Sequence, residues 1–260
     1  MSDLPLVSYI VRTVNRPLYL RECLQSINIQ TYPNIEVVLV NDGGPSIREY
    51  AEQVCPLPQL RIIENLHPLG RSNSANQGLE AASGNYVGFI DDDDVFYPWH
   101  TSDLVEQLER NHFRAVYADA LRATQIVCPF DSRRYMTTGL ELCYSKDYSR
   151  EEILKTNFIP ILCVLFERQL LDERQDLPAV RMDPMLHVLE DWDFWIKLGA
   201  VTDLVHLKKI TCEYRARIDG SNTVGQLNHV WEWSRQCIDR RYQEEREQYL
   251  KQEEGASVNV

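Results

Sequence analysis

Four consecutive aspartates, Asp91–Asp94, directly follow the apolar run Tyr86-Val-Gly-Phe-Ile90 and are the residues of this chain best suited to chemistry. Adjacent carboxylates raise one another's pKa and resist joint ionisation unless a cation or solvent compensates their charge. Charge runs are often solvated loops, but this run adjoins a hydrophobic segment, so a hard divalent metal is the favoured interpretation. An EF-hand calcium loop is excluded, because Val95 replaces a ligand and Ser102 stands where the bidentate glutamate belongs. We therefore expect a metal that is shared with a bound ligand.

The composition of the chain narrows the choice of that ligand. The chain has 260 residues, of which 44% are hydrophobic, and this length supports one sizeable core with at most a small appended lobe. Its formal net charge is −12 and its basic residues are scattered, so nothing predicts a nucleic-acid partner. Magnesium and manganese sites typically combine one or two carboxylates with substrate phosphate oxygens. The acidic run therefore favours a nucleotide diphosphate as partner and manganese or magnesium as cofactor.

The seven cysteines and the apolar segments indicate the compartment. The cysteines are odd in number and widely spaced, with no C-x-x-C pair, which argues for free thiols in a reducing compartment and against a structural zinc site. No signal peptide is recognisable at the start, and the longest apolar run, Ile159–Phe166, is far shorter than the roughly 20 residues that span a bilayer. We expect a cytoplasmic protein without a transmembrane segment, and peripheral association with the inner face of the membrane stays open.

Strand and helix patterns alternate before the aspartate run. Apolar segments predict buried strands at Leu6–Val11, Ile35–Val40, Leu60–Ile63 and Tyr86–Ile90. Helical patterns lie between these strands and begin near Pro17, Ser46 and Asn73. This order predicts a right-handed, mostly parallel sheet with helices on both faces.

The ends of these strands carry polar residues from separate parts of the chain. Ligands bind such sheets at the carboxyl ends of the strands. The turns at Thr13 and Asp42 and the acidic run that starts at Asp91 each follow a predicted strand. We expect these segments to converge on one edge of the sheet, which an isolated acidic loop would not require.

The second half of the chain is less regular. We expect a helix over 98–111, a strand over 115–118, a hairpin in the polar stretch to about residue 150, and a buried strand over 157–166. Glu190–Gly199 is typical of an amphipathic helix that ends at Gly199, because Trp192, Trp195 and Ile196 share a face with that glycine. A charged helical tail follows over residues 226–252.

Several ordered segments together carry a family resemblance. They are Val7-Ser-Tyr-Ile-Val-Arg-Thr-Val-Asn-Arg-Pro17, Gln30-Thr-Tyr-Pro-Asn-Ile-Glu36, Val40-Asn-Asp-Gly-Gly44, Asn65 to Gly70, and Gly84-Asn-Tyr-Val-Gly-Phe-Ile-Asp-Asp-Asp-Asp94. They resemble the nucleotide-binding half of family 2 glycosyltransferases of the α/β GT-A fold. The likeness is close over about residues 5–120 and resumes at Glu190-Asp191. It implies a Rossmann-like domain over 1–225, with a nucleotide-binding half at 1–120 and an acceptor half containing a small second sheet at 121–225. A C-terminal helical extension would occupy 226–260.

The resemblance implies a nucleotide-binding role for the first two strand ends. Thr13 and Arg16 would border the base and the ribose, and Asn15, which is also a candidate helix cap, belongs to the same nucleotide-binding set. Asp42 would accept a hydrogen bond from the imide N–H of uracil or thymine, which favours a UDP or TDP sugar. The ordinary alternative is a turn aspartate that caps Gly43.

The next segment would lie near the phosphates. By the resemblance, Gly70, Arg71 and Asn76 border the nucleotide, with the glycine permitting close backbone approach and the helix N-terminus favouring phosphate. An ordinary turn glycine is the alternative for Gly70.

Within the acidic run, the D-x-D-type signature of the family aligns with Asp92 toward the ribose and Asp93 toward the metal. Asp91 is grouped with the nucleotide-binding residues and competes for either role. Spacing does not decide which carboxylate binds the metal, because a shift of one residue leaves another acid in register.

Glu190-Asp191 resembles the acidic pair of the family in which the aspartate is the general base. Inverting transfer brings an acceptor hydroxyl to the anomeric carbon opposite the departing nucleoside diphosphate, and a positioned base contributes typically ~10²–10⁴-fold. A divalent metal stabilises the charge that grows on the leaving group. The ordinary alternative for the pair is charge placement at a helix N-terminus. Trp192 and Trp195 are expected in the core, with an acceptor platform as the alternative.

The chain departs from the family pattern at two places. Arg217 in Tyr214-Arg-Ala-Arg217 stands where many relatives have a histidine, and arginine can bind phosphate but not metal. The usual glycine-containing acceptor loop is replaced by the segments 157–162 and 183–188, so acceptor residues cannot be transferred.

We therefore expect an inverting, metal-assisted hexosyl- or deoxyhexosyltransferase of polysaccharide biosynthesis, with a glycan or lipid-linked saccharide as acceptor. A sugar nucleotidyltransferase would need a glycine-rich phosphate loop, which Val11–Arg16 lacks. A non-catalytic scaffold module of a larger polysaccharide-synthesising enzyme is the third hypothesis, with the C-terminal helix joining a neighbouring domain or a second copy. The presence of both Asp93 and Asp191 argues against it, because a binding module needs no base.

Overall fold

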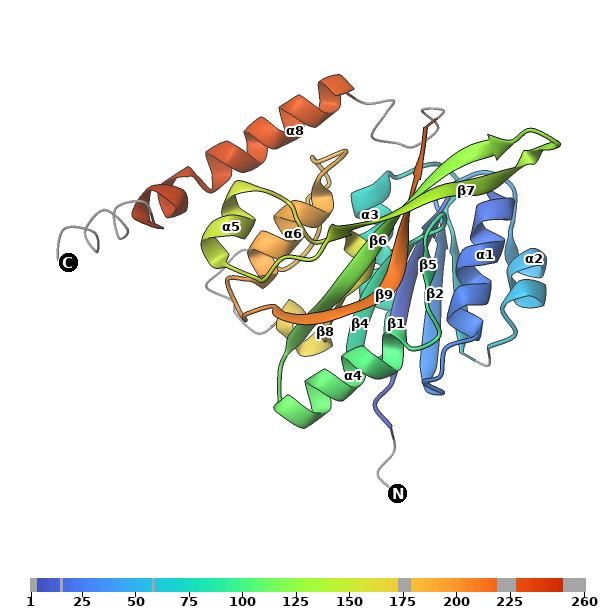
Figure 1. Cartoon of the computed structure of the whole chain (residues 1–260), viewed down its shortest axis with the longest axis horizontal. Helices are drawn as coiled ribbons and strands as arrows, with labels where there is room; N and C mark the ends of the chain where they lie inside the picture. The colour runs from blue at the N-terminus through green and yellow to red at the C-terminus, as the bar shows by residue number, and fades with distance from the viewer. Residues whose placement is uncertain (1–3, 15, 58, 173–178, 219–227, 250–260) are drawn as a thin grey trace.

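Figure 1 shows a computed structural model of the chain, which describes residues 4–14, 16–57, 59–172, 179–218 and 228–249. A central sheet runs through the molecule, and helices cover it on both sides (Figure 1). In the described part of the chain, no helix is long and apolar enough to cross a membrane.

The first half of the chain alternates strands and helices as the sequence predicts. Its elements are β1 (Val7–Thr13), α1 (Pro17–Asn28), β2 (Ile35–Asn41), α2 (Arg48–Val54), β3 (Leu60–Glu64), α3 (Arg71–Ala81) and β4 (Tyr86–Asp91). Strand β1 lies between β2 and β4, β3 lies beyond β2, and all of these pairings are parallel. Every residue of β1 and β2 is buried, which explains why these strands read as continuous apolar runs.

The second half extends the same sheet. Its strands are β5 (Val95–Phe96), β6 (Ala115–Cys128), β7 (Asp131–Tyr144), β8 (Val164–Glu167) and β9 (Val205–Arg217). The sheet order is β3-β2-β1-β4-β8-β6-β9-β5, with β7 paired to β6. Strand β8 is antiparallel to both β4 and β6, whereas β9 runs parallel to β6. The expected small second sheet is therefore not separate, because β6, β7 and β9 are continuous with the central sheet.

The second half also contains helices, and two of them, α6 and α8, contribute residues to the candidate site. They are α4 (His100–Asn111), α5 (Arg150–Lys155), the short 3₁₀ helices η1 (Ile161–Cys163) and η2 (Arg168–Leu171), α6 (Glu190–Leu198) and α8 (Asn228–Arg241). Gly199 follows α6 as predicted, and both tryptophans of α6 are buried in the core, at 1% exposure for Trp192 and 0% for Trp195. The α/β fold class and the hairpin formed by β6 and β7 are confirmed.

One expectation about this half is wrong in extent, and two elements were not expected. Residues 157–166 do not form one strand, because η1 interrupts them and β8 begins only at Val164. Pro160, which has no N–H to donate to a ladder, stands immediately before η1. Strand β9 and helix α5 were not expected at all from the sequence.

Helix α3 packs closely on the sheet and carries Arg71 at its first turn. Gly78 of α3 lies against Ile10 of β1, and a Cβ at this glycine would overlap the isoleucine side chain. The close contact places the N-terminus of α3 beside the carboxyl ends of β1 and β4, where Arg71 pairs with Asp91.

Candidate active site

The aspartate run lies at the carboxyl end of β4, beside the ends of β1 and β2. The residue pairing puts Thr13 opposite Asn41 and Arg12 opposite Asp91. The convergence of strand ends that the sequence predicts is therefore present, and each of the four aspartates has a different environment.

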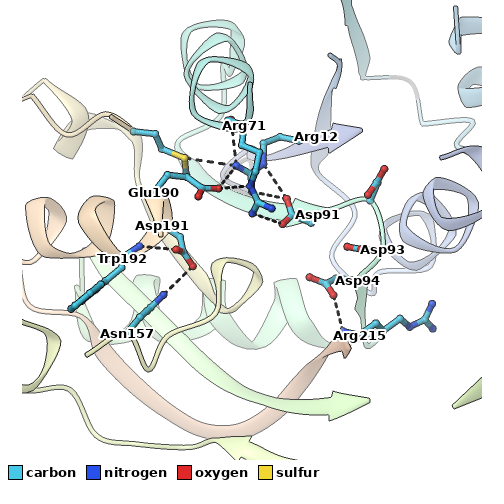
Figure 2. A network of polar contacts seen from close by, with 12 residues as sticks. Arg12, Arg71, Asp91, Asp93, Asp94, Asn157, Glu190, Asp191, Trp192 and Arg215 are labelled. Atoms are coloured by element: carbon cyan, nitrogen blue, oxygen red, sulfur yellow. Dashed lines mark hydrogen bonds and ion pairs between the residues drawn. The ribbon is translucent and has the colours of Figure 1, made fainter. Parts of the chain in front are cut away.

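Asp91 belongs to a cluster of two arginines and two carboxylates (Figure 2). Arg12 binds Asp91 at 2.6 Å and Glu190 at 2.9 Å, and Arg71 binds the same two carboxylates at 3.4 and 2.8 Å. Burial acts to raise the pKa of Asp91 and Glu190, but the two guanidiniums outweigh it and lower both pKa values. Both acids are therefore ionised and neutralised by arginine.

Asp92, the second aspartate of the run, is completely buried. The Thr13 hydroxyl donates to it at 2.6 Å, and the Arg16 guanidinium binds it with two N–H groups. Burial raises the pKa of Asp92 to about 7, against the opposing effect of Arg16. Asp92 thus holds Thr13 and Arg16 together.

Asp93 and Asp94 point to different partners. Arg16 and Arg217 both bind the Oδ2 atom of Asp93, at 3.1 and 2.6 Å, and the Asp93 side chain is 14% exposed. Asp94 is buried and accepts the backbone N–H of Arg215 at 2.8 Å. Burial, reinforced by the neighbouring Asp93 and Asp91, raises the pKa of Asp94 well above its usual range. Asp94 therefore anchors β9 to the run, whereas Asp93 keeps access to solvent.

Asp191 follows Glu190 in sequence but has no arginine bound to its carboxylate in the described structure (Figure 2). It accepts the Asn157 side-chain amide at 3.1 Å and the Trp192 backbone N–H at 2.8 Å. Burial, together with the charge of Glu190, raises the pKa of Asp191 to about 6. In Figure 2 its side chain points toward Asn157, whereas Glu190 points toward Arg12 and Arg71.

A cavity of about 280 Å³ connects the two acidic segments. Asp91 and Arg71 line it together with Glu190 and Asp191. Its remaining walls come from the 156–161 segment, from Tyr144 and other aromatic side chains, and from α8. A ligand in this cavity would contact Asp191 and the start of the aspartate run at once.

Asp42 organises the loop that precedes α3. Its carboxylate accepts the backbone N–H groups of Leu69 and Gly70, each at 2.8 Å, and the side-chain amide of Asn65 at 3.1 Å. Burial acts to raise the pKa of Asp42, but these donors outweigh it and lower the pKa. Gly70 has a φ of 89°, in the region that favours glycine, so it permits the turn that starts α3.

Comparison with known proteins identifies the family. The sequence model described as "Glycosyl transferase family 2" matches residues 8–174. The chain belongs to this family. Among its relatives, an uncharacterised glycosyltransferase of Haemophilus influenzae is 27% identical over 245 residues, which cover 88% of this chain and 70% of the relative. The uncharacterised glycosyltransferase YwdF of Bacillus subtilis is 30% identical over 209 residues, 79% of this chain and 71% of YwdF.

Solved structures show that this glycosyltransferase has the GT-A fold. TarS 1–349 of S. aureus, in complex with UDP, superposes with a TM-score of 0.65 at 19% identity, over 81% of this chain and 60% of TarS 1–349. Mannosyltransferase PcManGT of Pyrobaculum calidifontis, in complex with GDP-Man and Mn²⁺, superposes with a TM-score of 0.57 at 19% identity, over 82% of this chain and 57% of PcManGT. The chain thus spans about 60% of the length of these structures.

Two of the expected nucleotide-binding residues of this glycosyltransferase, Asn76 and Asn15, remain predictions. The side-chain amide of Asn76 donates to the Met182 carbonyl oxygen at 2.8 Å and accepts the Met182 backbone N–H at 3.0 Å, and so ties α3 to the segment that precedes α6. Asn15 lies outside the described residues.

Sequence reasoning missed Arg12 and Asn157. Arg12 is a charged residue inside a fully buried strand whose other residues are uncharged, and that exception was a usable signal for a buried ion pair. Asn157 carries no signal of this kind, because only the fold brings it to Asp191.

The fit of a divalent metal depends on Asp93. In the part of the chain that the structure describes, no three His, Cys, Asp or Glu side chains are grouped to hold a metal by themselves. A magnesium or manganese ion shared with a diphosphate typically needs only one or two carboxylates. Asp93 fits that role, because it is partly exposed and both of its arginines bind the Oδ2 atom, so that Oδ1 is the oxygen with which it would bind a cation.

Proposed function

We propose that this family 2 glycosyltransferase is inverting and moves a sugar from a nucleotide diphosphate donor to a saccharide hydroxyl, with Asp191 as general base. One observation carries the proposal. Within the acidic pair, Glu190 is neutralised by two arginines, whereas Asp191 accepts, among the described residues, a side-chain amide and a backbone N–H and faces the cavity. A carboxylate held in this way retains its basicity.

The chemistry follows from the position of Asp191. With a pKa of about 6, it is ionised at neutral pH and basic enough to take a proton from an acceptor hydroxyl. The proton passes from the acceptor oxygen to Asp191 while that oxygen bonds to the anomeric carbon and the bond to the diphosphate oxygen breaks. Asn157 and the Trp192 N–H orient the carboxylate for this transfer. We assign Glu190 the role of holding Arg12 and Arg71 in place.

The donor would lie along the aspartate run. Arg16 and Arg217 are placed to bind the diphosphate, since a guanidinium binds phosphate in bidentate fashion. Asp93 is the proposed ligand of manganese or magnesium, which would stabilise the charge of the departing diphosphate. We assign the ribose contact to Asp91, because Asp92 is completely buried and holds Thr13 and Arg16 instead.

The nucleobase of the donor is inferred from two observations, the ligands of similar solved structures and the contacts of Asp42. The solved relatives bind UDP, UDP-GlcNAc or GDP-Man, and one of them binds Mn²⁺, which supports a nucleotide-sugar donor and a divalent metal here. Asp42 already holds the 65–70 loop through three donors, so we propose that it positions this loop against the base. A UDP or TDP hexose or deoxyhexose is the donor we expect.

Thermal unfolding tests the donor site. UDP, TDP and GDP sugars are each added with manganese, and the correct donor at about 100 times its Kd should stabilise the fold by about 2.7 kcal/mol. Asp93→Asn should lose the manganese-dependent part of the shift, measured against the melting temperature of that variant without ligand. If no nucleotide sugar shifts the unmutated protein, or if Asp93→Asn shifts as much, the donor site is assigned wrongly.

Transfer kinetics test the base. Asp191→Asn should keep the donor-induced thermal shift and lose about 10²–10⁴-fold of the transfer rate, the usual contribution of a general base. A non-catalytic module would instead bind the donor and show no transfer in either protein.

A further inference from the structure

Helix α8 closes one side of the cavity beside Asp191. It lies beyond residues 8–174, which the family model matches, and it contributes Trp231 and Arg235 to the cavity wall. In Figure 1, α8 lies over α5 and α6, so an element outside the matched region reaches the proposed base.

Contacts with α5 and α6 hold α8 in this position. Arg241 binds Asp193 of α6 at 2.6 Å, and Arg235 donates to the Lys155 carbonyl oxygen of α5 at 3.1 Å. Ile238 is completely buried against the core. Helix α8 is therefore a fixed wall of the cavity in this structure.

The orientation of Trp231 is set by its neighbours. The Arg235 guanidinium lies 5.1 Å from the ring centre of Trp192 and 5.8 Å from that of Trp231, so cation–π contacts link the two indoles. Trp192 is buried and donates its indole N–H to the Ile153 carbonyl oxygen, whereas Trp231 is only half-buried. Trp231 thus presents aromatic surface to the cavity from a fixed position.

We propose that Trp231 is a residue that determines acceptor specificity, and that its indole packs against the apolar face of a neutral pyranose ring whose hydroxyl points to Asp191. This inference rests on the proposed function and names the acceptor class of the same site.

The size and lining of the cavity favour one sugar ring. A volume of about 280 Å³ lies just below the roughly 300–1,000 Å³ of pockets for drug-sized ligands, so it suits a single ring. Tyr144, Tyr214 and Trp231 supply aromatic walls from three separate elements, and Asn157 and Asp191 are among the polar groups that lie beside them. Aromatic walls beside polar side chains match a pyranose, which has apolar C–H faces and hydroxyls around its edge.

The charges favour a neutral ring over an anionic one. Asp91 and Glu190 are neutralised by Arg12 and Arg71, and Arg235 has Asp239 at 3.5 Å. Asp191 is the lining carboxylate without a bound arginine, so an anionic acceptor would meet its charge at short range. A uronic acid should therefore bind more weakly than the corresponding hexose.

Fluorine NMR tests the contact directly. The full chain, with its five tryptophans replaced by 5-fluorotryptophan, is saturated with the donor nucleoside diphosphate and manganese and titrated with methyl glycosides of glucose, galactose, mannose, rhamnose and N-acetylglucosamine. At least one of them should shift the Trp231 resonance and leave that of Trp233 in place, because Trp233 is 44% exposed and does not line the cavity. If none shifts it, or if methyl glucuronide shifts it equally, the inference is wrong.

Kinetics with matched variants give the second test. With the preferred glycoside as acceptor, Trp231→Ala should raise the acceptor KM about two- to tenfold, the range expected for loss of one aromatic contact. Trp231→Phe should recover most of the loss, and Trp233→Ala should change nothing. An unchanged acceptor KM in Trp231→Ala would refute the inference.

The two proposals fail in different ways. Donor-induced stabilisation depends on the donor site, and Trp231→Ala should preserve it. If Asp191→Asn loses transfer while Trp231→Ala behaves as the unmutated protein, only the inference about Trp231 falls. If no nucleotide sugar binds at all, the proposed function itself falls.

Discussion

Two carboxylates of α6 should respond in opposite ways to the loss of their charge. Asp191 accepts two neutral hydrogen bonds, whereas Asp193 is completely buried and pairs with Arg241 at 2.6 Å and Lys197 at 2.7 Å. We predict that Asp191→Asn stabilises the protein at neutral pH and that Asp193→Asn destabilises it. The comparison is well matched, because both residues lie in the first turn of the same helix.

The magnitude follows from the pKa of Asp191. Burial and Glu190 raise that pKa from 3.8 to about 6. Each unit corresponds to about 1.4 kcal/mol, so the ionised Asp191 lowers the free energy of unfolding by about 3 kcal/mol at neutral pH. Asparagine has one acceptor oxygen in place of two, so one hydrogen bond worth about 1 kcal/mol is lost. The net stabilisation is about 2 kcal/mol, or roughly 4–8 °C in Tm.

The pH dependence gives the sign of the effect. Below pH 3.8 the carboxyl is protonated in both the folded and the unfolded chain, so its raised pKa has no effect on stability. Between pH 3.8 and about 6 the unfolded chain loses the proton before the folded one does, and the cost of Asp191 grows. Above about pH 6 the cost is constant, so the stabilisation by Asp191→Asn should rise through this window and then level off.

Thermal unfolding of the unmutated protein and both variants between pH 5 and pH 8 checks this reasoning. Asp193→Asn should lower Tm at neutral pH, since breaking a buried ion pair typically costs about 3–5 kcal/mol. If Asp191→Asn lowers Tm at pH 7.5 as Asp193→Asn does, Asp191 is not an uncompensated carboxylate and its role as base loses its basis. Such a result would also remove the contrast with Glu190 on which the proposed function depends.

Three further predictions concern the same site. Glu190→Gln should lower stability by about 3–5 kcal/mol in denaturant unfolding, because it removes the buried charge that Arg12 and Arg71 share and leaves them only Asp91, whereas Glu52→Gln on the surface should change it by less than about 1 kcal/mol. Gly70→Ala should cost about 1 kcal/mol and weaken donor binding, since φ is 89° and no atom lies within 4 Å of the added Cβ; Gly139→Ala, equally open but without positive φ, is the control. The kcat/KM for transfer should fall as Asp191 is protonated below about pH 6, and a flat profile down to pH 5 would contradict its role as base.

The fold of the first half could be predicted because its signal is local. Strands β1 and β2 are buried on both faces, so most of their residues are apolar and each strand appears in the sequence as a nearly continuous apolar run. Strand β9 could not be predicted in the same way. It contains charged residues, only part of it is buried, and it pairs with β6, which lies far from it in the chain. Its conformation depends on pairing with β6, and no local sequence pattern predicts that pairing.

The candidate site, too, could be predicted only in part from the sequence. The aspartate run and Asp191 could be proposed as site residues from residue type and family resemblance, and the structure places Asp91 and Asp191 on one cavity. The individual roles could not be read, because neighbouring aspartates point to different sides and their partners come from distant segments. Trp231 stood within a tail that reads as a charged helix, and only its docking on α5 and α6 brings it to the cavity.

The contacts of the aspartate run also predict that donor binding and metal binding are coupled. The sequence suggested that a divalent cation relieves four adjacent carboxylates, but in this structure arginines compensate three of them, and Arg16 and Arg217 both bind Asp93. A diphosphate would compete with Asp93 for the same two guanidiniums, and they can bind phosphate only to the extent that Asp93 releases them. A cation on Asp93 favours that release, so manganese should tighten donor binding, and by linkage the donor must tighten manganese binding by the same factor. On this proposal an acidic chain would hold a diphosphate without a basic surface, because Asp93 keeps Arg16 and Arg217 in place until the donor and the metal bind.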